Sequence, residues 1–445
     1  MQEKTQHLPT SARYDLETLL RLRQIIQENM SDAEKKLYDE LQRTGLGTAF
    51  ATQYIIKQQH PEAEQYFTND KNSYGYWGPI AEQIVKTPQT LWIPTSLDAF
   101  KSTGLREIYT TYNDYTKNAI DESVDAAIAI ENWAYENKLN EFFLKNANFS
   151  AKHRWPTTCN IDYTFLPEQT CDKRVAHTLR HMNNINSYAL LYHTTPGLGW
   201  VARKKLDLEP YFYAFGTTIY KITNPENGDT KVLEYNGRED VRQYFIDLQK
   251  SNPNFKISWK HIGMPITKEL RVFSINGDIV GYVPYWSPAA FKNQSVYGID
   301  NDFNFDDAIK KLNKFEKSDL EHIHNETNKI ITHNKFHDTD WAIDWIKTRN
   351  GDWYMTDMQT AEGSYLDYNN MIFAHSNAQQ TVQEYMINHM NTLIRLSKNM
   401  SFSERAMMIL MNGGRNIGVE ERLAKLGYPD VKTLQQVQKT LRIGR

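Results

Sequence analysis

The chain has 445 residues and a formal net charge of −3, so no strong overall field draws it onto nucleic acid or an anionic membrane. Hydrophobic residues make up 40% of it and aromatic residues 12%, which excludes intrinsic disorder for most of its length. No run of about 18 apolar residues predicts a membrane span, and the N-terminus lacks the features of a secretory signal. We therefore expect a cytoplasmic protein of about two or three domains, with Cys159 and Cys171 as free thiols.

The first 150 residues are expected to form a mostly helical N-terminal region. Apolar residues recur at helical spacing from Leu16 to Ile26, as on the buried face of an amphipathic helix. A short segment at 106–112 is rich in β-branched and aromatic residues and predicts a strand. A further helix is predicted from about Ala119 to Lys145.

Residues 151–368 are expected to form a sheet-containing domain, because aromatic and β-branched residues there alternate with polar ones between Asn-Gly pairs. Residues 369–445 are expected to be helical again, with an amphipathic helix through Thr381 to Lys398. Residues 401–445 carry a net charge of +4. This basic stretch could contact nucleic acid, but a solvated helix face is the favoured interpretation.

A β-hairpin is predicted between Asp340 and Gln359, because Asn350-Gly351 separates two strand-like runs and Asn-Gly favours a two-residue type I′ turn. Such a turn places Asp344 directly opposite Asp357. Gln359, two residues further on, then points to the same face.

Two carboxylates at opposed strand positions repel each other, so something must compensate their charge. A magnesium ion held by Asp344, Asp357 and Gln359 would do so, since Mg²⁺ takes carboxylate and amide oxygens and shares its coordination with phosphates. The alternatives are that the pair is exposed to solvent, or that a neighbouring Lys or Arg screens it.

A second hairpin is predicted with Asn276-Gly277 as its turn. In its first strand Glu269, Arg271, Phe273 and Ile275 share one face. Glu and Arg beside Phe on one face indicate either a half-buried ion pair or an anion-binding arginine, and a surface Glu–Arg pair is the default interpretation.

Together the two hairpins resemble the C-terminal half of an ATP-grasp ligase. The family's E-x-R-V-F strand, short Gly-containing turn and following strand are matched by Glu269 to Gly281. Its later acidic strand and metal-holding strand are matched by Asp344, Asp357 and Gln359, although the last two replace the family's usual Glu and Asn. The resemblance covers roughly residues 190–365 and implies an α+β fold, with ATP-grasp-like antiparallel sheets and helices in 151–368.

Upstream segments are similar to the family's nucleotide-binding elements. The resemblance implies that Arg203, Lys204 and Lys205 hold phosphates and that Gly216 lies in a mobile loop covering them; a surface strand with a basic cluster is the other interpretation. The segment containing Trp259 and Ile262 falls where the family places its adenine-contacting hinge.

The resemblance implies an ATP- and Mg²⁺-dependent ligase that joins a carboxylate to an amine through an acyl phosphate. Arg271, with Glu269 beside it, would face the γ-phosphate or the acyl phosphate. The substrates would be small-molecule or peptide carboxylates and amines. The alternatives are a nucleotide-dependent phosphotransferase or nucleic-acid-modifying enzyme, and a non-catalytic nucleotide-binding protein.

Overall fold

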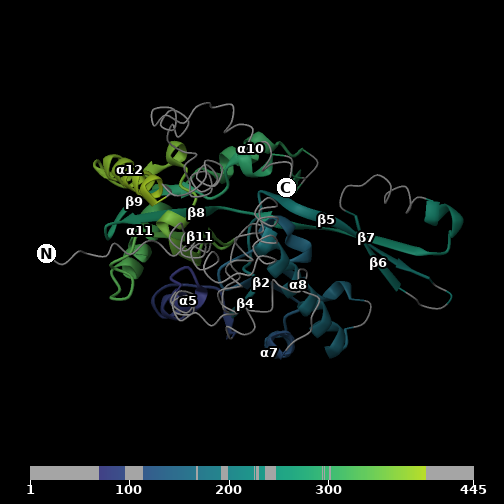
Figure 1. Cartoon of the computed structure of the whole chain (residues 1–445). Helices are drawn as coiled ribbons and strands as arrows, with labels where there is room; N and C mark the ends of the chain where they lie inside the picture. The colour runs from purple at the N-terminus through teal and green to yellow at the C-terminus, as the bar shows by residue number, and fades with distance from the viewer. Residues whose placement is uncertain are drawn as a thin grey trace.

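The structure is a computed structural model, shown in Figure 1, and it describes residues 70–396 apart from 96–113, 167–168, 192–198, 225, 227–229, 236–246, 293, 295 and 300–301. The predicted helix around residues 16–26, the predicted strand at 106–112 and the basic stretch 401–445 lie outside the described residues. The α-helices are α5 (Tyr74–Ile84), α7 (Asp114–Glu136), α8 (Cys171–Leu191), α10 (Phe305–Leu312), α11 (Lys317–Ile331) and α12 (Ala378–Leu396).

The strands form three sheets in which every neighbouring pair is antiparallel. The predicted α+β class is confirmed. The four-stranded sheet has the order β1 (Thr90–Pro94), β4 (Gly199–Lys204), β2 (Glu141–Asn146), β3 (Asn160–Asp162). The second sheet contains β10 (Val296–Tyr297), β5 (Phe212–Thr223) and β6 (Thr230–Tyr235), with β7 (Lys256–Ile266) also on β5. The five-stranded sheet has the order β12 (Trp353–Thr360), β11 (Trp341–Lys347), β8 (Glu269–Ile275), β9 (Asp278–Pro284), β13 (Ile372–Phe373).

Helices cover both faces of the five-stranded sheet, and β8 lies at its centre. Leu270 and Val272 pack with residues of α5 and α11 on one face, whereas Phe273 and Ile275 pack with α12 on the other. Every residue of β8 is buried. The predicted division of its side chains between two faces is therefore confirmed, but both faces are interior, so a surface Glu–Arg pair is wrong.

The hairpin of β8 and β9 has the predicted two-residue turn. Ile275 pairs with Asp278, and both central residues have positive φ, 54° at Asn276 and 79° at Gly277. Positive φ at both positions is the mark of a type I′ turn, which matches the twist of the strands it joins.

The hairpin of β11 and β12 has a longer turn than predicted. Thr348 N–H donates to the carbonyl of Asp352 at 2.9 Å, which leaves a three-residue loop whose last member, Gly351, has φ +91°. A type I turn followed by a left-handed glycine is the usual form of such loops. The two-residue turn was wrong.

The predicted pairing of Asp344 with Asp357 is nevertheless confirmed. An irregularity in the ladder between Asp344 and Trp345 places Thr356 as an extra residue on β12. This β-bulge shifts the register by one residue and offsets the one-residue difference in the turn.

The helix predicted to reach Lys145 ends at Glu136. Leu139 N–H donates to the Ala134 carbonyl at 2.8 Å, and Lys138 N–H donates to the Tyr135 carbonyl at 3.0 Å; Lys138 has φ 54°. This is the Schellman arrangement that ends many helices. The chain then enters β2, so Lys145 lies on a strand.

The four-stranded sheet joins parts of the chain on both sides of residue 150, because β1 and β2 pair with β4 and β2 also pairs with β3. The domain boundary expected near residue 150 falls between paired strands of one sheet. The helices α7 and α8 cover one face of this sheet, where Phe142 and Leu144 are buried.

Candidate functional site

Three charged side chains form a row across adjacent strands of the five-stranded sheet. Asp344 on β11 is paired in register with Arg271 on β8 and with Asp357 on β12. Arg271 Nε donates to Asp344 Oδ1 at 2.7 Å, and Nη2 donates to Oδ2 at 2.9 Å. Asp344 is only 2% exposed. A buried two-point contact of this kind is the strongest form of Arg–carboxylate pair.

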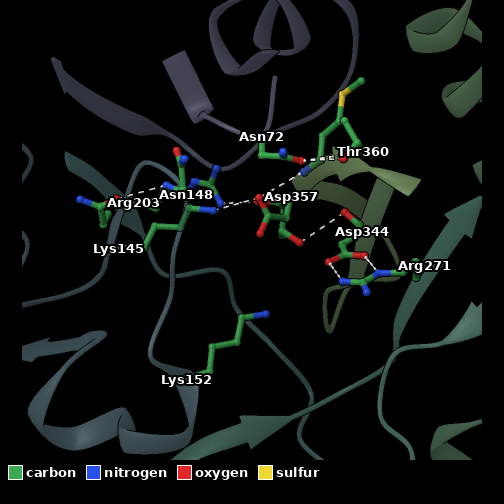
Figure 2. A network of polar contacts seen from close by, with 12 residues as sticks. Asn72, Lys145, Asn148, Lys152, Arg203, Arg271, Asp344, Asp357 and Thr360 are labelled. Atoms are coloured by element: carbon green, nitrogen blue, oxygen red, sulfur yellow. Dashed lines mark hydrogen bonds and ion pairs between the residues drawn. The ribbon is translucent and has the colours of Figure 1, made fainter. Parts of the chain in front are cut away.

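Lys145 reaches the other end of this row from the four-stranded sheet. Its Nζ lies 2.9 Å from Asp357 Oδ1, and the side chains are 4% and 31% exposed, respectively. Because alternate strand residues face opposite ways, Lys145 points away from α7 and α8, whereas Leu144 points toward them. Figure 2 shows Lys145 meeting Asp357 while Arg271 meets Asp344.

The surroundings of this second pair shift both pKa values below their ordinary range. Burial lowers the pKa of Lys145, and Asp357 opposes this only in part. For Asp357, burial alone would raise the pKa, but Lys145 and Arg203 lower it. The Asp357 carboxylate is therefore held in its charged form.

A third pair joins Lys152 to Glu269, the first residue of β8. Lys152 Nζ lies 3.2 Å from Glu269 Oε1, 3.4 Å from the hydroxyl of Tyr285 and 4.6 Å from the centre of the Tyr285 ring. Burial alone would lower the pKa of Lys152, but the negative charge of Glu269 raises it. Arg271 lies 4.9 Å from the same ring centre, so Tyr285 separates and orients two cations.

Arg203 on β4 is the fourth cation, and it is buried. Its Nη1 donates to the Thr356 carbonyl on the bulge of β12, and its guanidinium lies 5.0 Å from the ring centre of Tyr74 and 5.9 Å from that of Trp77 on α5. Its Nε is buried and has no hydrogen-bond partner among the described residues. Arg203 thus ties the bulge beside Asp357 to the four-stranded sheet.

Asn72 fixes the end of β12 beside these residues. Its Oδ1 accepts from the backbone N–H of Thr360 at 2.7 Å and from the Thr360 hydroxyl at 3.2 Å. Asn148, in the loop between Lys145 and Lys152, donates to Asp70. Figure 2 shows Asn72 and Thr360 on one side of Asp357 and Lys152 on the other.

The assembled site contains four cationic side chains, Lys145, Lys152, Arg203 and Arg271, and three acidic ones, Glu269, Asp344 and Asp357. Buried charge without a partner is costly, and here each acid has a cation while one positive charge is left over. An arrangement of this kind is suited to a polyanion such as a chain of phosphates.

A magnesium site at the predicted residues has the right donor types. Asp357 Oδ1 accepts from Lys145 and from the Met358 N–H at 3.2 Å, which leaves Oδ2 for a ligand, and Gln359 follows on the same face of β12. Carboxylate and amide oxygens suit Mg²⁺. Within the part of the chain that the structure describes, no group of three or more His, Cys, Asp or Glu is arranged to hold a metal ion. The donor types suit Mg²⁺, but both carboxylates already have a cationic partner, Lys145 or Arg271.

Five of the predicted site residues come together: Arg203, Glu269, Arg271, Asp344 and Asp357. The interpretation in which a Lys or Arg screens the aspartate pair describes the structure, since Lys145 and Arg271 do so.

The remaining predicted nucleotide-binding residues lie elsewhere. Lys204 is exposed because it points opposite to Arg203 on the same strand, and Lys205 pairs with Glu141 at 2.7 Å. Gly216 lies inside β5 beside Phe215, which has φ 55° at an irregularity of the ladder, so its placement in a loop was wrong. Ile262 is 7% exposed within an apolar cluster, and of Trp259 only the backbone, in β7, is described.

Lys145 and Lys152 were not predicted as site residues, nor was the position of Tyr285 between Lys152 and Arg271. A signal was present for the first, because Phe142-Phe143-Leu144 directly before Lys145 is typical of a strand rather than of a helix end. Nothing local distinguishes Lys152, whose partner Glu269 is 117 residues away along the chain.

Among the described helices, none combines the length and apolar character that a membrane crossing needs. No model of a protein family matches the chain, and no curated protein matches it.

The solved structures that are similar to the chain include two ligases. D-cycloserine synthetase DcsG is 9% identical, with 72% of this chain and 70% of that chain covered and a TM-score of 0.31. D-alanyl-alanine synthetase A from Vibrio cholerae is 12% identical, with 71% and 66% covered and a TM-score of 0.27. Both are ATP-grasp ligases, the family that the two hairpins resemble. At TM-scores this low the likeness carries no weight for function, which has to be inferred from the residues.

Proposed function

We propose that the chain is an ATP- and Mg²⁺-dependent ligase that joins a carboxylate to an amine. The observation that carries this proposal is that four cations lie beside the acidic residues of β8, β11 and β12. These cations are Lys145, Lys152, Arg203 and Arg271. Four cations, of which three are buried and Lys152 is partly buried, surround two carboxylates and an amide. They would supply what phosphoryl transfer requires, namely positioning and neutralisation of phosphate charge.

The reaction would proceed in two displacements. A carboxylate oxygen of the first substrate attacks the γ-phosphorus of ATP, and the bond to the β-phosphate oxygen breaks to release ADP. The amine nitrogen of the second substrate then attacks the acyl carbon, the bond to the phosphate oxygen breaks, and the nitrogen loses a proton. The products are an amide, ADP and phosphate.

The charged residues have distinct roles in this proposal. Lys145 and Lys152, at the two ends of the loop that contains Asn148, would bind the phosphate oxygens that travel with ADP. Arg271 would face the transferring phosphoryl group, because it lies in the row itself and keeps its charge at any pH that the fold tolerates. Tyr285 would hold Lys152 and Arg271 apart, so that two cations contact different oxygens.

Asp357 and Gln359, with Asp344 beside them, would hold the magnesium ion. When bound, Mg²⁺ would neutralise negative charge on the phosphates during transfer. Arg203, on β4, would keep Asp357 in place by holding the carbonyl of the neighbouring bulge residue Thr356.

Calorimetric titration of ATP into the full chain, with and without Mg²⁺, tests the nucleotide site. We expect binding that depends on Mg²⁺ in the parent protein and is lost in Asp357→Ala, because that change removes the partly exposed carboxylate assigned to the metal. Arg349→Leu serves as a control, since Arg349 pairs with Asp207 on the surface. Equal binding by parent and Asp357→Ala would refute the assignment of Asp357.

The ligase activity is tested by ADP release from ATP with a panel of small carboxylates, each assayed with and without an added amine. We expect turnover that requires both substrates. ADP release that depends on neither substrate, or phosphate transfer to a hydroxyl, would overturn the ligase proposal while leaving the nucleotide site intact.

A further inference from the structure

Both carboxylates of the proposed metal site already have a cationic partner from the protein itself. Arg271 contacts both oxygens of Asp344, and Lys145 contacts Asp357 at 2.9 Å. A divalent ion entering this site by itself would lie next to the Lys145 ammonium and close to the Arg271 guanidinium. In a buried setting such like-charge contact is strongly unfavourable.

The two ion pairs differ in how readily they can open. The Arg271–Asp344 pair makes two hydrogen bonds, joins adjacent strands of one sheet, and its side chains are 10% and 3% exposed. Lys145, whose side chain is 4% exposed, makes one contact to Asp357, whose side chain is 31% exposed, and the two residues belong to different sheets. Lys145 is therefore the cation that can exchange its partner without breaking a sheet.

A triphosphate changes this balance. Its oxygens offer Lys145 a stronger anionic partner than a single carboxylate. Movement of the ammonium from Asp357 to a phosphate oxygen would free the carboxylate at the same moment that further negative charge arrives. Metal and nucleotide would then bind together, because each alone would leave the charge of either Lys145 or Asp357 without a partner.

We propose that Lys145 is a specificity-determining residue that makes the site accept a divalent cation only together with a triphosphate. In the absence of nucleotide, the Lys145 ammonium occupies the cation position beside Asp357. When a triphosphate binds, the ammonium moves to a phosphate oxygen and the metal ion takes its place. This inference rests on the proposed nucleotide site and adds to it the order and selectivity of binding.

The test compares the full-length parent protein with Lys145→Met, using MgCl₂ alone, ATP alone and ATP with MgCl₂ as the probes in calorimetry. We expect no Mg²⁺ binding by the parent protein in the absence of ATP. In Lys145→Met, Asp357 has lost its lysine partner, so we expect this variant to bind Mg²⁺ alone at least about tenfold more tightly than the detection limit for the parent. Binding of ATP with Mg²⁺ should weaken by about tenfold in the variant, as expected for loss of one charged partner.

Lys347→Met is the matched control. Lys347 on β11 pairs with Asp319 at 2.7 Å and lies on the opposite face of the sheet from Asp344. The substitution Lys347→Met removes a lysine from a Lys–Asp pair, as Lys145→Met does, but from a pair that contains neither Asp344 nor Asp357. We expect this variant to bind neither more Mg²⁺ nor less ATP than the parent.

A melting-temperature measurement keeps the test decisive if Lys145→Met is destabilised. Mg²⁺ alone should raise the melting temperature of Lys145→Met but not that of the parent or of Lys145→Arg, which retains the positive charge. Mg²⁺ binding by the parent protein without ATP, or an unchanged Mg²⁺ response in Lys145→Met, would overturn the inference. Absence of any ATP binding by the parent, with or without Mg²⁺, would instead refute the nucleotide site itself.

Discussion

The two sheets that meet at the site handle their charges in different ways. In the five-stranded sheet, Arg271 and Asp344 lie on adjacent strands and satisfy each other within the sheet. In the four-stranded sheet, the polar partners of Lys145 and Arg203 among the described residues are Asp357 and the Thr356 carbonyl, which lie on β12 of the five-stranded sheet. The five-stranded sheet pairs Arg271 with Asp344 internally, whereas its Asp357 is paired with Lys145 from the four-stranded sheet.

This difference indicates that the site exists only when the two sheets are docked. The acidic row can form wherever β8, β11 and β12 pair in register. Lys145 and Arg203, in contrast, contact Asp357 and the Thr356 carbonyl only when β12 lies against the four-stranded sheet. Docking and site formation are therefore one event, and variants should affect the two sheets unequally.

The largest effect is expected where the five-stranded sheet pairs its own charges. Arg271→Leu leaves Asp344 buried without a partner, and we expect the free energy of unfolding to fall by about 3 to 5 kcal/mol. Denaturant titration measures this loss. The double variant Arg271→Leu/Asp344→Leu should recover much of it, because no buried charge remains.

The surface pair Arg349–Asp207, with side chains 57% and 79% exposed, provides the comparison. Arg349→Leu should change the free energy of unfolding by less than about 0.5 kcal/mol. If Arg271→Leu were equally mild, the buried pair would not be the element that stabilises this sheet.

Acid should weaken the four-stranded sheet before the five-stranded one. Under this sheet α8 carries His177 and His181, and burial lowers their pKa values to about 4 and about 3. His181 is 3% exposed, and its Nδ1 lies 2.7 Å from the Thr158 carbonyl oxygen, so the neutral ring donates there.

The folded chain keeps these histidines neutral, whereas the unfolded chain protonates them near pH 6.5. The free energy of unfolding should thus fall as the pH drops from about 7 toward 4, by about 2 kcal/mol at pH 5 for His181. Hydrogen exchange should show β2 and β4 losing protection before β8 and β11. His181→Gln should flatten the pH dependence, and His322→Gln, at an exposed position, should not; simultaneous loss of protection in both sheets would contradict the comparison.

The smallest effect is expected at the turn that sets the register of the acidic row. Gly351 has φ +91°, and a Cβ built there has no atom within 4 Å, so Gly351→Ala is strained only by its backbone conformation. We expect a loss of about 1 kcal/mol in the free energy of unfolding. Gly277→Ala is the matched comparison, since Gly277 has φ +79° and equally open space around a built Cβ; no loss in either variant would show that positive φ is not the cause.

Two hairpins of the five-stranded sheet, β8 with β9 and β11 with β12, and the pairing of Asp344 with Asp357 were predictable from the sequence. The short strand β13 was not, since it lies in 369–445, which was expected to be helical. Turn chemistry and the two-residue period of a strand are local properties, so Asn276-Gly277 and the alternation in β8 could be read directly. Even so, the pairing of Asp344 with Asp357 was predicted correctly only because a bulge at Thr356 offsets the extra residue in the turn. That bulge is where Arg203 from the other sheet contacts β12.

Which cations reach Asp344 and Asp357 depends on contacts between segments far apart in the chain. Lys145 and Asp357 are separated by 212 positions in sequence, and their contact depends on helix α7 ending at Glu136 and on how two sheets pack. Lys204 and Lys205 carry the same charge next to Arg203, yet one is exposed and the other pairs with Glu141. Charge and strand pattern specify which side chains are available, but the packing of distant apolar faces selects the ones that meet.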